Sequence, residues 1–164
     1  MGHILMLIFV GMISTVGFAM LFHVKAAHIP FAAIGGALSS AIYIILDDFG
    51  ISLFLSNFIA SLVSVVYSGV MARVLKTPTT IFVSLCIIPL VPGGSLFYTM
   101  RNLIMWNQAE FFRYGLNTIL IALGIAGGIV VESAIVHLMG RAIAKARRQQ
   151  APPQEIQKKT GLSH

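Results

Sequence analysis

Long stretches without a formal charge are the feature that most constrains this chain of 164 residues. Leaving Glu132 aside, these stretches span residues 1–24, 26–46, 49–72, 77–100 and 114–140. A helix needs ~20 apolar residues to cross the ~30 Å hydrocarbon core of a bilayer. Only helices or closed barrels satisfy the backbone hydrogen bonds there. The sequence therefore predicts an all-α integral membrane bundle of about five transmembrane helices.

The overall composition agrees with a membrane protein. Hydrophobic residues make up 57% of the chain and charged residues 10%, whereas soluble domains are ~25% charged. This excludes a disordered chain and almost any ordinary soluble enzyme. An alternative topology has four transmembrane helices, with the fourth stretch entering and leaving the membrane on the same side.

The fourth stretch contains the run Pro-Leu-Val-Pro-Gly-Gly at residues 89–94. Its two prolines lack amide donors and obstruct the preceding helical turns, and the two glycines permit positive φ angles. We therefore expect the helix to be broken between Pro89 and Gly94, rather than merely kinked. Broken helices at membrane depth are tolerated where they are buried in protein or line a wet cavity. Transporters use them because the helix ends attract charged groups of solutes.

The same run supports a family resemblance. Residues 88–94, followed by Phe97-Tyr98, resemble the signature of the threonine/serine exporter family, and residues 17–22 are similar to the end of the first helix in one half of those proteins. The resemblance covers roughly residues 5–140. The chain resembles the smaller, membrane-embedded second half of the exporter. Some members of the family make the two halves as two separate chains.

The resemblance implies a larger partner subunit and a multi-pass location in the bacterial cytoplasmic membrane. Members of the family export threonine and serine, and some two-chain members are associated with export of the dicarboxylate succinate. The implied function is thus the small subunit of a secondary exporter for one of these solutes. An alternative is a membrane scaffold or assembly subunit without a transport pathway of its own.

Residues at and after the break form the predicted substrate site. Helix-end dipoles would face a substrate carboxylate, and Ser95 or Tyr98 the polar remainder of the substrate. Arg101 would hold a carboxylate bidentately; the alternative is an arginine extended to the membrane interface. The complete predicted set is Pro89, Pro92, Gly93, Gly94, Ser95, Tyr98 and Arg101.

Glu132 is the one acidic residue deep in a predicted helix. A charge at that depth costs ~2.5–3.5 kcal/mol or more and marks a candidate functional site. We expect Glu132 to take part in proton coupling; the alternative is a neutral or hydrogen-bonded side chain at a subunit contact. Asn57 and Asn117 are expected to form hydrogen bonds between helices.

Small residues recur at four-residue spacing in three of the predicted helices. Such side chains let helix backbones approach closely, which favours packing where lipid removes the hydrophobic driving force. The pattern predicts tight contacts within the chain or with a partner, and it includes Ala32, Gly36 and Ser40, then Ala60, Ser64, Ser68 and Ala72, then Gly124 and Gly128.

The net charge of +6 comes mainly from the end of the chain. Residues 141–164 contain six Lys and Arg against Glu155 alone. We expect residues 1–140 to form the transmembrane domain and residues 141–164 a basic, partly disordered cytoplasmic tail that faces anionic lipid. This topology places the predicted connection at residues 101–113 outside, although Arg101 and Arg113 oppose that placement. Nucleic-acid binding is not expected, because no aromatic residues interleave with the basic run.

Enzymatic chemistry is not expected. The predicted helices contain no Ser/His pair, paired Asp or His-x-x-x-His arrangement at membrane depth. Asp47-Asp48 has no third ligand nearby in sequence and is expected to be a solvated turn, so neither a metal nor a cofactor is predicted. Without a nucleotide-binding motif, the energy for transport would come from an ion or proton gradient.

Overall fold

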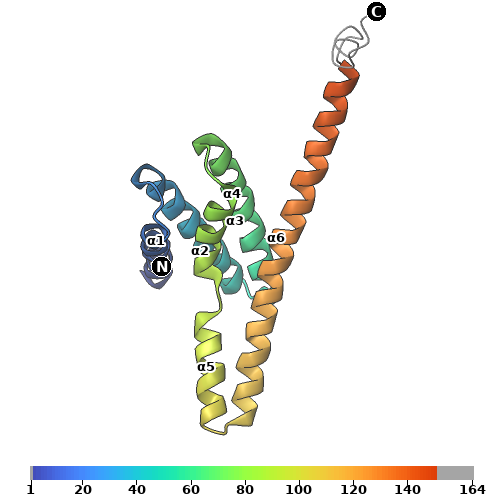
Figure 1. The fold of residues 1–164 in the computed structure, drawn as a ribbon. Helices are drawn as coiled ribbons and strands as arrows, with labels where there is room; N and C mark the ends of the chain where they lie inside the picture. The colour runs from blue at the N-terminus through green and yellow to red at the C-terminus, as the bar shows by residue number, and fades with distance from the viewer. Residues whose placement is uncertain (1, 151–164) are drawn as a thin grey trace, which may run out of the picture. The chain divides into compact units, whose positions relative to one another are not determined.

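A computed structural model describes the backbone of residues 2–150 and the side-chain surroundings of residues 4–136. The described chain is all-helical, as predicted (Figure 1). Its elements are α1 (Gly2–Leu21), η1 (Ala26–His28), α2 (Ile29–Asp48), α3 (Leu53–Leu75), α4 (Thr79–Ile87), η2 (Ile88–Leu90), α5 (Gly93–Ile104) and α6 (Gln108–Gln150). Two compact units divide the chain after Val131, within α6, and each is described by itself.

Four helices are long and apolar enough to cross a membrane: Ile4–Leu21, Ala26–Asp48, Leu53–Leu75 and Gln108–Val136. A further pair, Thr79–Leu90 and Gly93–Ile104, is bent by 53° and forms either a broken span or a re-entrant loop. The chain is therefore a multi-pass membrane protein with four to five candidate spans. Both predicted topologies agree with this arrangement.

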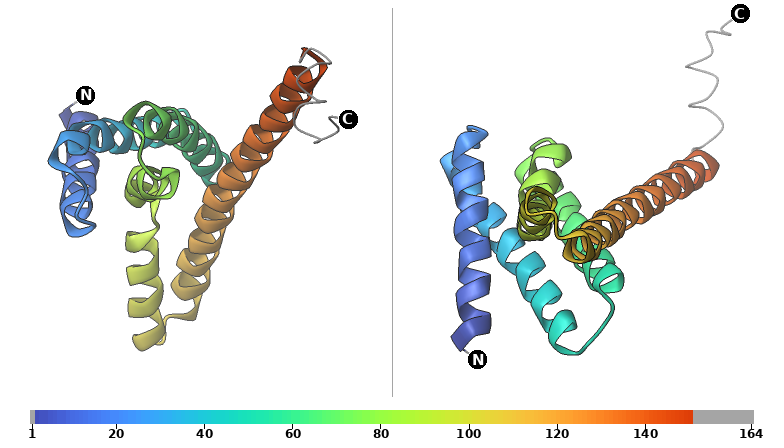
Figure 2. Two further views of the ribbon diagram at one scale, coloured as in Figure 1. Left: turned by 45° about the horizontal axis from the view of Figure 1, so that its top comes forward. Right: turned by 90° about the horizontal axis from the view of Figure 1, so that it is seen from below.

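Helices α1 to α4 pack against one another (Figure 2). Small residues form their contacts, which confirms the predicted packing faces. A Cβ added at Gly36 would collide with Thr15 of α1, and one at Gly35 would collide with Cys86 of α4. The predicted residues Ala32, Gly36, Ser40, Ala60, Ser64, Ser68, Ala72, Gly124 and Gly128 are all buried. These faces exclude large side chains, which point outward as expected for a helix surrounded by lipid.

Most of the buried hydroxyl groups in this packing donate to carbonyls of their own helices. Ser64 and Ser68 donate to the carbonyls of Ala60 and Ser64 at 2.6 and 2.7 Å, respectively. Thr15 donates to the carbonyl of Gly11 at 2.9 Å. Ser68 also approaches the carbonyl of Phe82 in α4 at 3.3 Å, and Ser61 that of Gly124 in α6 at 3.5 Å. Because the shorter bonds lie within each helix, these serines and threonines act mainly as small packing residues.

The part of α6 before Val131 packs on α3 through glycines. A Cβ at Gly124 would lie 2.6 Å from the carbonyl oxygen of Phe54, and one at Gly128 would lie 2.9 Å from the carbonyl oxygen of Phe58. Ile121 and Ile125 of α6 join Ala60 and Leu90 in a buried cluster. Because the opposing atoms belong to the α3 backbone, this contact depends on the absence of side chains.

The connection predicted at residues 101–113 is wrong. Helix α5 continues through Arg101 to Ile104, and α6 begins at Gln108, so only a short turn joins them. Arg101 and Arg113 therefore lie within helices, and Arg113 pairs with Glu110 one turn earlier at 3.5 Å. The charges that interrupted the hydropathy pattern mark the ends of two helices rather than a long loop.

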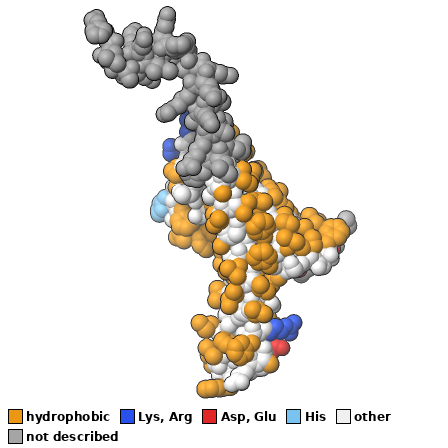
Figure 3. Space-filling model, turned by 90° about the vertical axis from the view of Figure 1, so that its right-hand side faces the viewer, with side chains coloured by type: hydrophobic (Ala, Val, Ile, Leu, Met, Phe, Trp, Pro, Cys, Tyr) orange, Lys and Arg blue, Asp and Glu red, His pale blue; other side chains and the backbone are white. Residues whose placement is uncertain are grey.

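Helix α5 and the beginning of α6 form a hairpin (Figure 1). The rings of Tyr98 and Tyr114 stack with their centroids 5.2 Å apart, and none of the α5 residues is buried. In Figure 3, hydrophobic side chains cover most of this hairpin, toward the bottom of the view. The hairpin thus presents a large apolar surface to its surroundings.

Gly50 makes the tight turn between α2 and α3 with a φ of 73°, a conformation that L residues rarely adopt. Asp47 and Asp48 are exposed at this turn, in agreement with the predicted solvated connection. The predicted tail lies partly outside the described residues, which end at Gln150. The boundary between residues 140 and 141 stays a prediction.

Candidate substrate cavity at the broken helix

Two prolines interrupt the helical hydrogen bonding between α4 and α5. Helix α4 ends at Ile87, a single 3-10 turn follows to Leu90, and α5 begins at Gly93. The amide of Val91 donates back to the carbonyl of Ile88 at 3.1 Å, and that of Gly93 donates to Val91 at 2.7 Å. The predicted break is therefore confirmed, and it is sharper than a proline kink.

The two glycines of the break act through their missing side chains. Among the described glycines only Gly50 has a positive φ, so Gly93 and Gly94 do not use the positive φ that glycine permits. No heavy atom lies within 4 Å of a Cβ built at either residue. Their missing side chains instead leave open space beside the first turn of α5.

That space is a cavity of about 180 Å³. It is smaller than the ~300–1,000 Å³ pockets that hold drug-sized ligands, and its volume suits one small metabolite. Four helical segments and the break supply its lining, which consists of Tyr43 of α2, Asn57 of α3, the continuous run from Pro89 to Ser95, and Ile121 of α6.

Backbone groups provide most of the polarity of this cavity. The amides of Gly94 and Ser95 donate to no acceptor among the described residues. The carbonyls of Pro89 and Leu90 accept from no donor among them. No side chain caps the start of α5, so the first-turn amides retain the positive end of the helix dipole. Donors and acceptors thus lie in one cavity, with no charged side chain in its lining.

Asn57 adds an amide side chain to the wall opposite the break. It is 1% exposed, and its Nδ2 donates to the carbonyl of Leu53 in its own helix at 2.8 Å. The Nδ2 group of Asn57 therefore does not form the predicted hydrogen bond to another helix, and that prediction is wrong for this group. Its Oδ1 accepts no hydrogen bond from a described group and can receive one from a solute.

The structure brings together five of the predicted substrate-site residues, namely Pro89, Pro92, Gly93, Gly94 and Ser95. Tyr98 and Arg101 do not line this cavity. Tyr98 stacks on Tyr114, and Arg101 is exposed further along α5. Substrate binding by any of the seven stays a prediction.

Sequence reasoning missed Tyr43 and the contribution of Asn57 to this cavity. Tyr43 lies in an apolar run that contains no Pro or Gly, so no local signal marks it. Asn57 is the only amide within α3; its polarity was visible, but its position opposite the break was not. Contacts between distant helices, rather than motifs, place both residues in the wall.

Glu132 belongs to the second unit and is 8% exposed. Its part in proton coupling stays a prediction. The side-chain surroundings of His137 lie outside the described residues. Within residues 4–136, no cluster of three His, Cys, Asp or Glu side chains could hold a metal ion.

A comparison with protein families gives one match over most of the chain. The model described as "Threonine/Serine exporter, ThrE" matches residues 7–135. No curated protein and no solved structure matches the chain. The matched range contains all the segments that line the cavity, including the break and the part of α6 that packs on α3.

Proposed function

The chain belongs to the threonine/serine exporter family, and on that premise we propose that the cavity at the broken helix binds the exported amino acid. The family consists of transporters rather than enzymes, and its substrates are amino acids. The observation that carries the proposal is the cavity of about 180 Å³ in which free backbone donors and acceptors meet without a charged side chain.

A zwitterion matches this set of groups. The amides of Gly94 and Ser95 suit a carboxylate, because they lie at the positive end of α5. The free carbonyls of Pro89 and Leu90 suit an ammonium group, as unwound carbonyls do for cations in broken transporter helices. Asn57 and Ser95 remain for a side-chain hydroxyl, which both threonine and serine possess.

Succinate fits the same cavity less well. A dicarboxylate carries two negative charges, and burial of an unpaired carboxylate is costly. The lining contains one helix N-terminus but no Lys, Arg or His. We therefore propose a hydroxy-amino acid as the substrate, and a dicarboxylate becomes the competing outcome of the test.

We further propose that this chain acts with a larger partner subunit in the bacterial cytoplasmic membrane, with its C-terminus in the cytoplasm. Support comes from the resemblance to the smaller half of a two-chain exporter and from the exposed apolar hairpin. Leu96, Phe97 and Met100 of α5 are 47, 64 and 59% exposed. Mild-detergent purification of the tagged chain should retain one larger membrane protein of the same family; purification without any companion would contradict this part.

We also propose that Glu132 couples transport to a proton gradient, because it is an acidic residue that is only 8% exposed. Glu132→Gln keeps the size of the side chain but removes its acidity. We expect this variant to lose the dependence of transport on the pH gradient while its abundance stays normal. An unchanged pH-gradient dependence would remove Glu132 from coupling.

The proposed function is tested by efflux from the host cells of this protein. Cells that lack the chain, or have it restored, are loaded with labelled threonine, serine or succinate. We expect the restored chain to accelerate loss of threonine and serine and to leave succinate unchanged. Faster succinate loss alone would reassign the substrate, and equal loss of all three with and without the chain would favour the scaffold alternative.

A further inference from the structure

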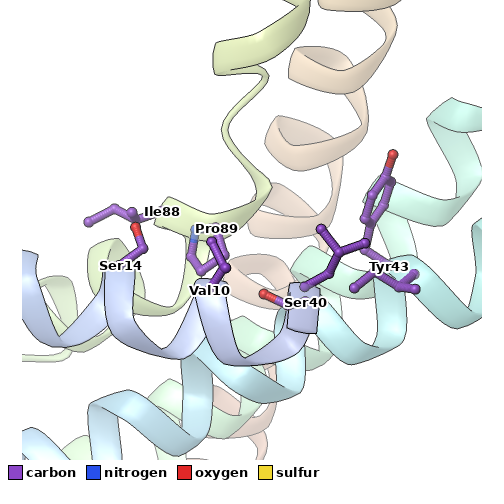
Figure 4. A pocket seen from close by; sticks show the side chains of 9 residues that line it. Val10, Ser14, Ser40, Tyr43, Ile88 and Pro89 are labelled. Carbon is purple, nitrogen blue, oxygen red and sulfur yellow. The ribbon is translucent and has the colours of Figure 1, made fainter. Parts of the chain in front are cut away.

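A second cavity lies on the other side of the break. Its volume is about 300 Å³, and it lies between α1, α2 and the 3-10 turn η2 (Figure 4). Its lining consists of Leu7, Val10, Gly11, Ser14, Ser40, Tyr43, Ile44, Ile88 and Pro89. Tyr43 and Pro89 also line the break cavity, so these two residues form the boundary that both cavities share.

Three hydroxyl groups give this mostly apolar cavity its polar part, those of Ser14, Ser40 and Tyr43. Ser14 forms no hydrogen bond with any described group, whereas its neighbour Thr15 donates to the carbonyl of Gly11 at 2.9 Å. Ser40 donates to the carbonyl of Gly36 at 3.0 Å and keeps its acceptor capacity. The Tyr43 hydroxyl has no partner among described groups, and in Figure 4 it points away from Ser14 and Val10.

The missing side chain of Gly11 lets α1 lie close to α2 and to the break. A Cβ there would collide with the side chain of Ser40 and would lie 3.6 Å from the Cβ of Pro89. Helix α1 therefore meets both α2 and the break at this point. The cavity is formed by the same elements that hold Pro89 in place.

From the shared boundary and the free hydroxyls we infer that this second cavity is a further binding chamber for the exported amino acid. The inference rests on the proposed function and extends it. The amino acid occupies the break cavity and the α1–α2 chamber in succession, and the Tyr43 side chain separates the two positions. Ser14 and Ser40 supply hydrogen-bonding groups to the zwitterion while it occupies the chamber.

Cysteine labelling tests occupancy of the chamber. In the full-length chain, Cys86→Ser removes the one native thiol, with Cys86→Ala as a second background, and wild-type threonine efflux is verified in each. Ser14→Cys reports from the chamber, and Ile44→Cys gives an independent reporter on α2. Ile13→Cys is the matched control because Ile13 is 56% exposed on the outer face of α1.

We expect a small water-soluble thiol reagent to label the two reporters. At threonine equal to twice its dissociation constant, their labelling should slow about threefold, as competition for one site requires. The rate at Ile13→Cys should not change with threonine. Absence of labelling at both reporters would show a dry cavity and overturn the inference, as would labelling that threonine does not slow.

Substitutions at Tyr43 test the boundary between the two cavities. Tyr43→Trp narrows the passage, so threonine efflux should fall about tenfold more than serine efflux, because one methyl group separates the two substrates. Tyr114→Phe serves as a matched control, since Tyr114 lines neither cavity. Equal effects on both amino acids would overturn the role of Tyr43.

These outcomes separate the two proposals. If the restored wild-type chain produces no threonine or serine efflux, the proposed function fails and the second chamber fails with it. If wild-type efflux is normal but the chamber reporters show no protection, only the second chamber is overturned.

Discussion

Helices α3 and α5 belong to the same unit, yet they are held in opposite ways. Helix α3 buries eight residues, six of them serine or alanine, whereas none of the α5 residues is buried. In lipid, burial of small residues marks helix contact, since large apolar side chains lose nothing by facing acyl chains. The comparison identifies α3 as a scaffold and α5 as a lightly attached helix.

The break cavity lies between these two helices. Its volume is about 180 Å³, and its lining includes Asn57 of α3 and the backbone at the start of α5. A transport site needs one wall that keeps its shape and another that can adjust when the substrate enters or leaves. The contrast in packing therefore agrees with the cavity serving as a substrate site.

The largest effect is expected where α6 packs closely on α3, at Gly128. Gly128→Ala places a Cβ 2.9 Å from the carbonyl oxygen of Phe58 in α3, and overpacking of this kind costs about 1–3 kcal/mol. Gly17→Ala is the matched control, because nothing lies within 4 Å of its Cβ and alanine favours a helix by up to ~1 kcal/mol. The midpoint of thermal unfolding in detergent should fall for the first variant and stay or rise for the second.

A fall of the same size for both glycines would contradict the close approach of α3 and α6. It would indicate that glycine acts through helix flexibility and not through the missing side chain.

At the break, substitution should reduce transport without loss of fold. Gly94→Val fills open space in the cavity, since no atom lies within 4 Å of a Cβ at this position. We expect threonine efflux to fall by about tenfold or more, with the abundance of the protein in the membrane unchanged. Loss of abundance together with transport would show that α5 depends on this glycine for packing, contrary to its description as lightly attached.

Asn57 and Asn102 allow a closely matched test of the cavity wall. Each Nδ2 donates to the carbonyl four residues earlier at 2.8 Å, but only Asn57 lines the break cavity. Loss of one hydrogen bond to the substrate, worth ~1.5 kcal/mol, should lower the apparent affinity for threonine about tenfold in Asn57→Ala. Asn102→Ala should retain the wild-type KM; equal KM values in the two variants would exclude Asn57 from substrate binding.

The smallest effect is expected at Arg101. This residue is exposed and lies outside the break cavity, so Arg101→Gln removes only a surface charge, which is worth little. Efflux of threonine should stay within about twofold of wild type. A tenfold rise in KM would return Arg101 to the binding site and favour a substrate with an additional carboxylate.

The helices and the break were predictable because each leaves a local signal. The absence of charge marks membrane spans, and Pro89, Pro92 and the following glycines disrupt any continuous helix. The connection between α5 and α6 was predicted with the wrong bounds. Hydropathy places the charged residues Arg101 and Arg113 in a connection outside the membrane, whereas in the structure Arg101 lies within α5 and Arg113 within α6. A charge near a helix end and a charge in a loop give the same pattern in sequence.

The cavity itself was only half predictable. Residues 89–95 are consecutive and act through their backbone, so their motif revealed them. Tyr43 and Asn57 enter the cavity from α2 and α3, which are brought to the break by the packing of Gly11, Gly35 and Gly36 against neighbouring helices. That packing depends on the mutual placement of four helices, which no single segment of sequence contains.

Direct transport in reconstituted vesicles tests the central claim that the break cavity binds a hydroxy-amino acid. Wild type and Gly94→Val, each purified with the companions it retains, are compared for exchange of labelled threonine against internal threonine, serine or succinate. We expect wild type to exchange threonine for threonine and serine but not for succinate, and Gly94→Val to exchange none of them. Equal threonine exchange by the two proteins would contradict the assignment of this cavity.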